Sequence, residues 1–145
     1  MHHERIAILD YGSQYTRLIT RRLRELGAFG LVYGPGATAA EIGGADLKGV
    51  ILSGGPASVL EPGAPGLDPA ILALGVPVLG ICLGLQIINA HFGGVTAPLP
   101  GCVHGKPDTL HYAGQARTVA RYHSLHLSAM GAGMRSDDAH LRTRV

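Results

Sequence analysis

Short apolar runs alternate with helix-forming segments through the first hundred residues, and this alternation limits the folds open to the chain. The apolar runs lie at residues 6–9, 29–33, 49–52 and 77–80. The helical patterns lie at residues 13–26, 37–43, 69–74 and 83–92. Strands that are apolar throughout and alternate with helices form parallel sheets covered on both faces. The predicted fold class is therefore α/β, an open and mostly parallel sheet with helices on both faces.

Local signals refine this outline at both ends of the chain. Ser13 is the expected N-cap of the first helix, and Gly27 is its expected end. Beyond residue 95 the sequence has β-like runs broken by glycine and proline, without a strong helical pattern. These runs predict strands at residues 109–112, 118–122, 126–130 and 139–145. No repeat and no long linker divides the chain, so a single domain over residues 1–145 is expected.

Composition excludes several classes of protein. Apolar residues make up 46% of the 145 residues, which is enough for a core. The 12 basic and 10 acidic residues give a net charge of +2, which is no footprint for nucleic acid. Two cysteines, Cys82 and Cys102, form neither a disulfide framework nor a zinc motif, and no phosphate-binding GxxxxGK[ST] pattern occurs. We expect no metal, no cofactor and no membrane segment, and a cytoplasmic location.

The segment LGICLGLQ at residues 79–86 places Cys82 between a strand and a helix. This is the cysteine version of a nucleophile elbow, in which a sharp turn lifts the side chain out of the sheet. The N-terminus of the following helix would favour the thiolate, and the N–H of Leu83 could face an oxyanion. The alternative is a small buried side chain, which is what a lone cysteine usually is.

The segment SGGPAS at residues 53–58 follows another predicted strand. Gly54 and Gly55 have no Cβ, so their backbone N–H groups can approach a ligand closely. In a parallel sheet this loop would lie at the same edge as Cys82 and could complete an oxyanion hole with Leu83. Taken alone, the segment is also compatible with a simple turn before Pro56.

These segments resemble the class I (triad-type) glutamine amidotransferases. The resemblance rests on ILDYGSQYTRLITRRLREL, VILSGGPASV and GVPVLGICLGLQ. Over roughly residues 5 to 95 the similarity is to the glutaminase domains of GMP synthases. The later segments VHGKPDTLHYAG and RYHSLHL resemble anthranilate and aminodeoxychorismate synthase glutaminase subunits. The resemblance implies a flavodoxin-like glutaminase fold.

The resemblance also implies roles for particular residues. Cys82 would attack the amide carbon of L-glutamine and form a thioester, while Gly55 and Leu83 would stabilise the oxyanion. The remaining implied contacts to glutamine involve Gly54, Gln86, His123, Ser124 and Leu125. The ammonia released would pass to a synthase subunit as partner.

The histidine and carboxylate of the family's triad come from an H-P-E segment, which this sequence lacks. The chain is therefore expected to be C-terminally shortened, with a sheet edge that a partner or a homodimer covers. Two substitutes for the base are open: His123, and His140 with Asp138 beside it on a strand. The other weighed histidines, predicted on other faces or in loops, are His91, His104, His111 and His126.

Three functions follow from these features. The leading prediction is a glutaminase that supplies ammonia to a synthase such as GMP synthase. The second is a catalytically impaired relative that binds glutamine or a synthase without efficient turnover. The third is a cysteine hydrolase of peptidase-like families, against which SGGPAS and GLQ argue.

Overall fold

The computed structural model describes residues 4–112 and 114–134 of the chain. The chain divides into two compact units, Met1–Ile88 and Asn89–Val145. The first contains a four-stranded sheet and the second a two-stranded sheet. The expectation of one domain over residues 1–145 stays a prediction.

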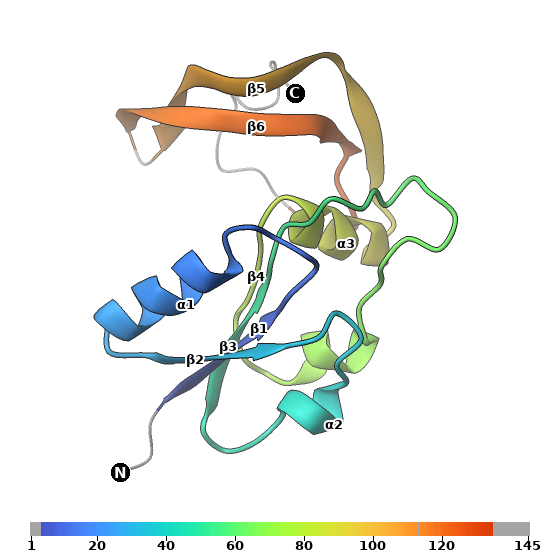
Figure 1. Cartoon of the computed structure of the whole chain (residues 1–145). Coiled ribbons are helices and arrows are strands. Elements are labelled where there is room, and N and C mark those ends of the chain that lie inside the picture. Colours follow the sequence, from blue (N-terminus) through green and yellow to red (C-terminus); the bar gives the residue numbers. More distant parts are fainter. Residues whose placement is uncertain (1–3, 113, 135–145) are drawn as a thin grey trace. The chain divides into compact units, whose positions relative to one another are not determined.

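The sheet of the first unit is entirely parallel. Its strands are β1 (Arg5–Leu9), β2 (Phe29–Tyr33), β3 (Leu47–Leu52) and β4 (Val78–Gly80). They lie in the order β2-β1-β3-β4, and every neighbouring pair is parallel (Figure 1). The predicted parallel α/β sheet is therefore confirmed. The order also makes β1 and β3 the two central strands, with β2 and β4 at the edges.

Helices cover both faces of this sheet, as predicted. The helical elements are α1 (Thr16–Glu25), α2 (Ala39–Ile42), the 3-10 helix η1 (Pro69–Ala73) and α3 (Leu83–His91). A Cβ atom built on Gly30 would lie 3.1 Å from Leu23 of α1 and 3.2 Å from Ile8. Ala7 and Leu9, which alternate with Ile8 along β1, belong to the buried cluster that contains α2 and η1 residues. Figure 1 shows α1 and α2 on opposite sides of the sheet.

The first helix begins later than its sequence predicts. Ser13 is not its N-cap; helical geometry starts at Thr16, with Tyr15 in the capping position. The Ser13 hydroxyl instead accepts the N–H of Tyr15, and the carboxylate of Asp10 accepts the N–H of Ser13. Side chains that satisfy backbone donors in a turn compete with helix formation, so the turn extends through residue 15. The predicted end at Gly27 is confirmed, since this residue has a φ of +83°.

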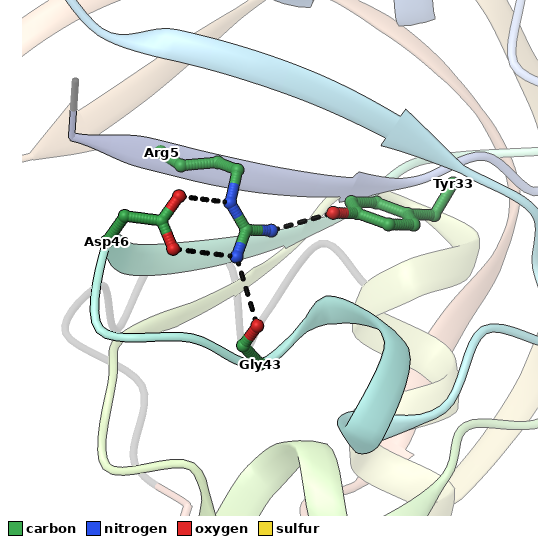
Figure 2. Close-up of polar contacts among 4 residues, drawn as sticks. All are labelled: Arg5, Tyr33, Gly43 and Asp46. Atoms are coloured by element: carbon green, nitrogen blue, oxygen red, sulfur yellow. Dashed lines mark hydrogen bonds and ion pairs between the residues drawn. The ribbon is translucent and has the colours of Figure 1, made fainter. Parts of the chain in front are cut away.

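A buried arginine joins the first strand to the loop before the third (Figure 2). Arg5 is 8% exposed, and its guanidinium forms a two-pronged ion pair with Asp46, at 2.8 and 3.1 Å. It also donates to the hydroxyl of Tyr33 at 2.7 Å and to the carbonyl of Gly43 at 3.2 Å. The hydrogen bond to Asp46 is the main cause that raises the pKa of Arg5 above its usual value. The network links β1, β2 and the segment after α2.

Replacing Asp46 by alanine should lower the free energy of unfolding by about 2 kcal/mol, because the buried guanidinium of Arg5 loses its carboxylate. The midpoint of urea unfolding measures this loss. Arg21→Ala is the control, since it breaks an exposed ion pair with Glu25 and should cost less than about 0.5 kcal/mol. Equal effects of the two substitutions would contradict a structural role for the Arg5 network.

The second unit contains a long antiparallel ribbon. Its strands are β5 (Val95–Tyr112) and β6 (Gln115–Ala129). The strands predicted at residues 109–112, 118–122 and 126–130 are confirmed as strand, except for Met130. They are not separate short strands, however, but parts of two continuous ones. The predicted strand at residues 139–145 lies outside the described residues.

Proline and glycine misled the strand prediction in β5. Pro98 pairs with Leu125 and Pro107 with Ala120, and the register shifts between Pro98 and Val103 and again between His104 and Lys106. A proline lacks the N–H donor, but a two-stranded ribbon tolerates it where the nitrogen faces away from the partner strand or beside a bulge. None of the helices in the described ranges combines the length and apolar character of a transmembrane span.

Candidate functional site

Three loops follow β1, β3 and β4 at one edge of the parallel sheet. In such sheets ligands bind beyond the carboxyl ends of the strands. The N–H of Tyr11, just after β1, donates to the hydroxyl of Ser53, just after β3, at 2.9 Å. The N–H of Ile81, just after β4, donates to the carbonyl of Leu52 at 2.9 Å. The loops at residues 10–13, 53–56 and 81–83 are thus held together at this edge.

Cys82 lies at the turn between β4 and α3. Its φ is +53°, and no other non-glycine residue of the described chain has a positive φ. That conformation is strained for a residue with a Cβ, and such strain clusters at functional sites. The side chain is exposed, so the alternative of a buried cysteine is excluded. The geometry is that of a nucleophile elbow.

Two glycines make this turn sterically feasible. A Cβ on Gly80 would lie 2.6 Å from the nitrogen of Leu85 and 2.7 Å from Cα of Leu85, at the start of α3. A Cβ on Gly84 would collide with the carbonyl oxygen of Leu52 in β3 and lie 2.7 Å from the Leu52 Cβ. The helix can therefore pack directly on the sheet only because both positions lack a side chain.

The SGG segment lies directly against the elbow. A Cβ built on Gly54 would be 3.5 Å from the Cβ of Cys82. One built on Gly55 would be 3.1 Å from a methyl group of Leu83 and would overlap the carbonyl oxygen of Tyr11. The structure thus brings together Gly54, Gly55, Cys82 and Leu83, four of the predicted site residues. Gly55 in particular has no room for any side chain.

Backbone donors surround this cluster. Within the part of the chain that the structure describes, no hydrogen bond joins the N–H of Gly55 or Leu83 to a protein acceptor. Leu83 is the first residue of α3, where the N–H has no acceptor inside the helix. The fold therefore leaves two backbone donors without a protein acceptor in the described loops around Cys82.

The remaining predicted contacts lie on two elements. Gln86 is on α3, one turn after the elbow; its N–H donates to the carbonyl of Cys82 at 3.1 Å, and the residue is 7% exposed. His123, Ser124 and Leu125 lie on β6 of the second unit. Their predicted grouping with Cys82 stays a prediction.

Asp10 and Ser53 are polar residues at this edge for which the sequence predicted no role. The Asp10 carboxylate accepts hydrogen bonds from the N–H of Gly12 and the hydroxyl of Thr16, both at 2.9 Å. Burial by itself would raise the pKa of Asp10, but these hydrogen bonds, together with the N–H of Ser13 and the nearby hydroxyl of Ser53, hold it below its usual value. An aspartate directly after a strand and before a glycine is the signal that indicates such a turn.

Histidines that could act on Cys82 are absent from its own unit as described. Residues 4–88 contain no histidine at all. His91 ends α3 and contacts Phe92 edge-on, with ring centroids 5.0 Å apart. The ribbon carries the candidates His104, His111, His123 and His126. The proposed pair of His140 and Asp138 lies outside the described residues. Between residues 4 and 134, as described, no group of His, Cys, Asp and Glu is arranged to hold a metal ion.

The structure combines a parallel α/β sheet with a cysteine at a strand-to-helix turn and glycines packed against it. Comparison with known families specifies the class of protein to which this arrangement belongs. The model of the family "Glutamine amidotransferase class-I" matches residues 7–140. The chain belongs to the class I glutamine amidotransferases.

Individual relatives are GMP synthases. The chain is 56% identical over 89 residues to the glutamine-hydrolysing GMP synthase of a Nitratiruptor species, in a match that covers 61% of this chain and 17% of that protein. It is 45% identical over 106 residues to the enzyme of Lacticaseibacillus rhamnosus, covering 73% of this chain and 20% of that protein. The chain thus spans about a fifth of the length of these relatives.

A solved structure shares the fold. A protein from Thermoplasma acidophilum, described as a subunit of GMP synthase, superposes with a TM-score of 0.68 at 26% identity. The match covers 91% of this chain and 70% of that protein. The flavodoxin-like glutaminase fold expected from the sequence is therefore confirmed.

Proposed function

We propose that this chain is a glutaminase that hydrolyses L-glutamine to glutamate and ammonia through a thioester on Cys82. The observation that carries the proposal is the exposed cysteine with a φ of +53°, placed beside Gly54, Gly55 and Leu83. The ammonia would serve a synthase subunit, because the relatives of this chain are glutamine-hydrolysing GMP synthases.

The reaction divides into acylation and hydrolysis. The sulfur of Cys82 attacks the side-chain amide carbon of glutamine, and the N–H groups of Gly55 and Leu83 stabilise the oxyanion. The C–N bond then breaks, the amide nitrogen takes up a proton and leaves as ammonia, and the thioester forms. Water next attacks the thioester and releases glutamate and the free thiol. Gly54, Gln86, His123, Ser124 and Leu125 are the proposed contacts to glutamine.

Labelling tests the proposal without requiring turnover. A chloroketone that mimics glutamine should alkylate Cys82, and excess L-glutamine should slow the labelling at least about tenfold, because both occupy one site. Mass spectrometry of peptides locates the label. D-glutamine is the matched control and should protect much less. Labelling elsewhere, or labelling that L-glutamine does not slow, would rule out the glutaminase site.

A second candidate function is glutamine binding without efficient turnover. It is favoured by the absence of histidine from residues 4–88, the stretch that carries Cys82. Loss of a triad base lowers turnover by several orders of magnitude in other enzymes. Protected labelling together with no measurable release of glutamate would support this candidate, whereas release of glutamate would support the first.

A further inference from the structure

Ser53 carries a fully buried hydroxyl at the same edge of the sheet as Cys82. Its side chain is 0% exposed and lies between two loops. The Oγ atom accepts the N–H of Tyr11 at 2.9 Å and donates its proton to the carbonyl oxygen of Gly54 at 2.8 Å. Asp10 is the other acceptor close to this hydroxyl. The hydroxyl has one proton, and the hydrogen bond to Gly54 directs that proton at the SGG segment.

The hydrogen bond from Ser53 to the Gly54 carbonyl also fixes the direction of the next N–H, that of Gly55. The carbonyl of Gly54 and the N–H of Gly55 belong to one planar trans peptide unit, so they point in opposite directions. Holding the carbonyl toward Ser53 therefore also sets the direction of the Gly55 N–H.

This peptide unit needs such an anchor more than others do. A peptide unit reverses by changing ψ of the residue before it and φ of the residue after it, and here both residues are glycines. Glycine has the widest range of allowed backbone angles, so neither residue has a Cβ that would restrict the two angles involved. In the reversed state a carbonyl oxygen would stand where the N–H donor is needed.

We propose that Ser53 is a positioning residue, whose hydroxyl keeps the Gly54–Gly55 peptide oriented so that the Gly55 N–H can stabilise the oxyanion formed at Cys82. This inference rests on the proposed function. Ser53 touches neither the thiol nor the substrate in this role. It acts through the peptide that carries the donor.

Acylation by a γ-glutamyl 4-nitrophenyl ester tests the proposal in the full chain. The Cys82 sulfur bonds to the carbonyl carbon of the ester, the C–O bond to the nitrophenyl group breaks, 4-nitrophenolate leaves, and the thiol proton passes to buffer. This leaving group needs no proton, so the burst of nitrophenolate reports acylation without any histidine. Ser53→Ala should slow the burst about 10- to 100-fold. This is less than the roughly 100- to 1,000-fold that accompanies outright loss of one oxyanion donor, because the Gly55 N–H keeps its orientation part of the time.

Two controls separate positioning from damage to the fold. Iodoacetamide alkylates a thiol without forming an oxyanion, so its rate at Cys82 should stay within about twofold in Ser53→Ala. Ser58→Ala removes a neighbouring hydroxyl that accepts the N–H of Leu60 in an exposed turn, and it should leave the burst unchanged. Ser53→Cys, close in size with a weak S–H donor, should give an intermediate burst and serves if Ser53→Ala does not fold.

The amide signal of Gly55 in an NMR spectrum gives a readout that does not depend on activity. It should be single in the unmodified chain and doubled or broadened in Ser53→Ala, because two peptide orientations become populated. A single sharp Gly55 signal in Ser53→Ala, or a burst within twofold of the unmodified chain, overturns the proposal. If the unmodified chain reacts with iodoacetamide but never with the ester, the glutaminase proposal fails, and the Gly55 signal alone then decides the role of Ser53.

Discussion

Replacing Cys82 by glycine should abolish labelling by the glutamine-mimicking chloroketone and, at the same time, raise the free energy of unfolding by about 1 kcal/mol. Labelling is lost because the thiol is gone. Stability rises because the φ of +53° is strained for a residue with a Cβ but relaxed for glycine. The side chain is exposed, so its removal leaves no cavity. Mass spectrometry and urea unfolding measure the two effects.

Cys82→Ser separates these two effects. Serine keeps the Cβ and therefore the strain, so stability should stay within about 0.5 kcal/mol of the unmodified chain while labelling disappears. If Cys82→Gly were instead less stable than Cys82→Ser, the strain at the elbow would not be what the backbone angle indicates, and the argument for a functional turn would lose its physical basis.

Gly84→Ala should strongly destabilise the fold by separating helix α3 from the sheet. The new Cβ would collide with the carbonyl oxygen of Leu52 and lie 2.8 Å from its carbonyl carbon, both backbone atoms of a central strand. Backbone atoms cannot move aside as a flexible side chain can, so α3 would have to shift away from the sheet. We expect a loss of about 3 kcal/mol or more in the free energy of unfolding.

Gly36→Ala is the matched control for this prediction. No heavy atom lies within 4 Å of a Cβ at position 36, and its φ is not in the left-handed region. The same change should therefore alter stability by less than about 0.5 kcal/mol, or raise it slightly. A comparable loss at both positions in urea unfolding would show that helix α3 does not depend on close approach to β3.

The sequence predicted the first unit well because its strands are mostly apolar, with Arg5 and Lys48 as the charged residues among them. The runs around Ala7, Val50 and Leu79 have no polar alternation, which is typical of a parallel sheet covered by helices. The segment around Cys82 was also readable, since glycines at positions 80 and 84 indicate a tight strand-to-helix turn. These features depend only on residues close together in the sequence, so they can be recognised in a single sequence.

Other features depend on contacts between residues far apart in the sequence, and no local sequence pattern predicts such contacts. Arg5 reads as a solvated residue at the start of a strand, yet Asp46 and Tyr33 bury it. Ser53 reads as the first residue of a glycine turn, yet Tyr11 donates to it from another loop. The length of the ribbon was missed because Pro98 and Pro107 signal breaks, although an edge position accepts them.

Those prolines have a consequence for how the ribbon meets other molecules. Each strand of a two-stranded ribbon presents an outer edge whose backbone could recruit a further strand from a neighbouring chain. Along β5, a proline has no N–H to donate to an incoming strand. Each shift of register also interrupts the regular spacing of backbone hydrogen-bonding groups that continuous strand pairing requires. β6 has no proline, but Arg117 puts a positive charge along it. Both edges therefore carry residues that oppose the addition of further strands, and so the growth of fibrils, from this ribbon.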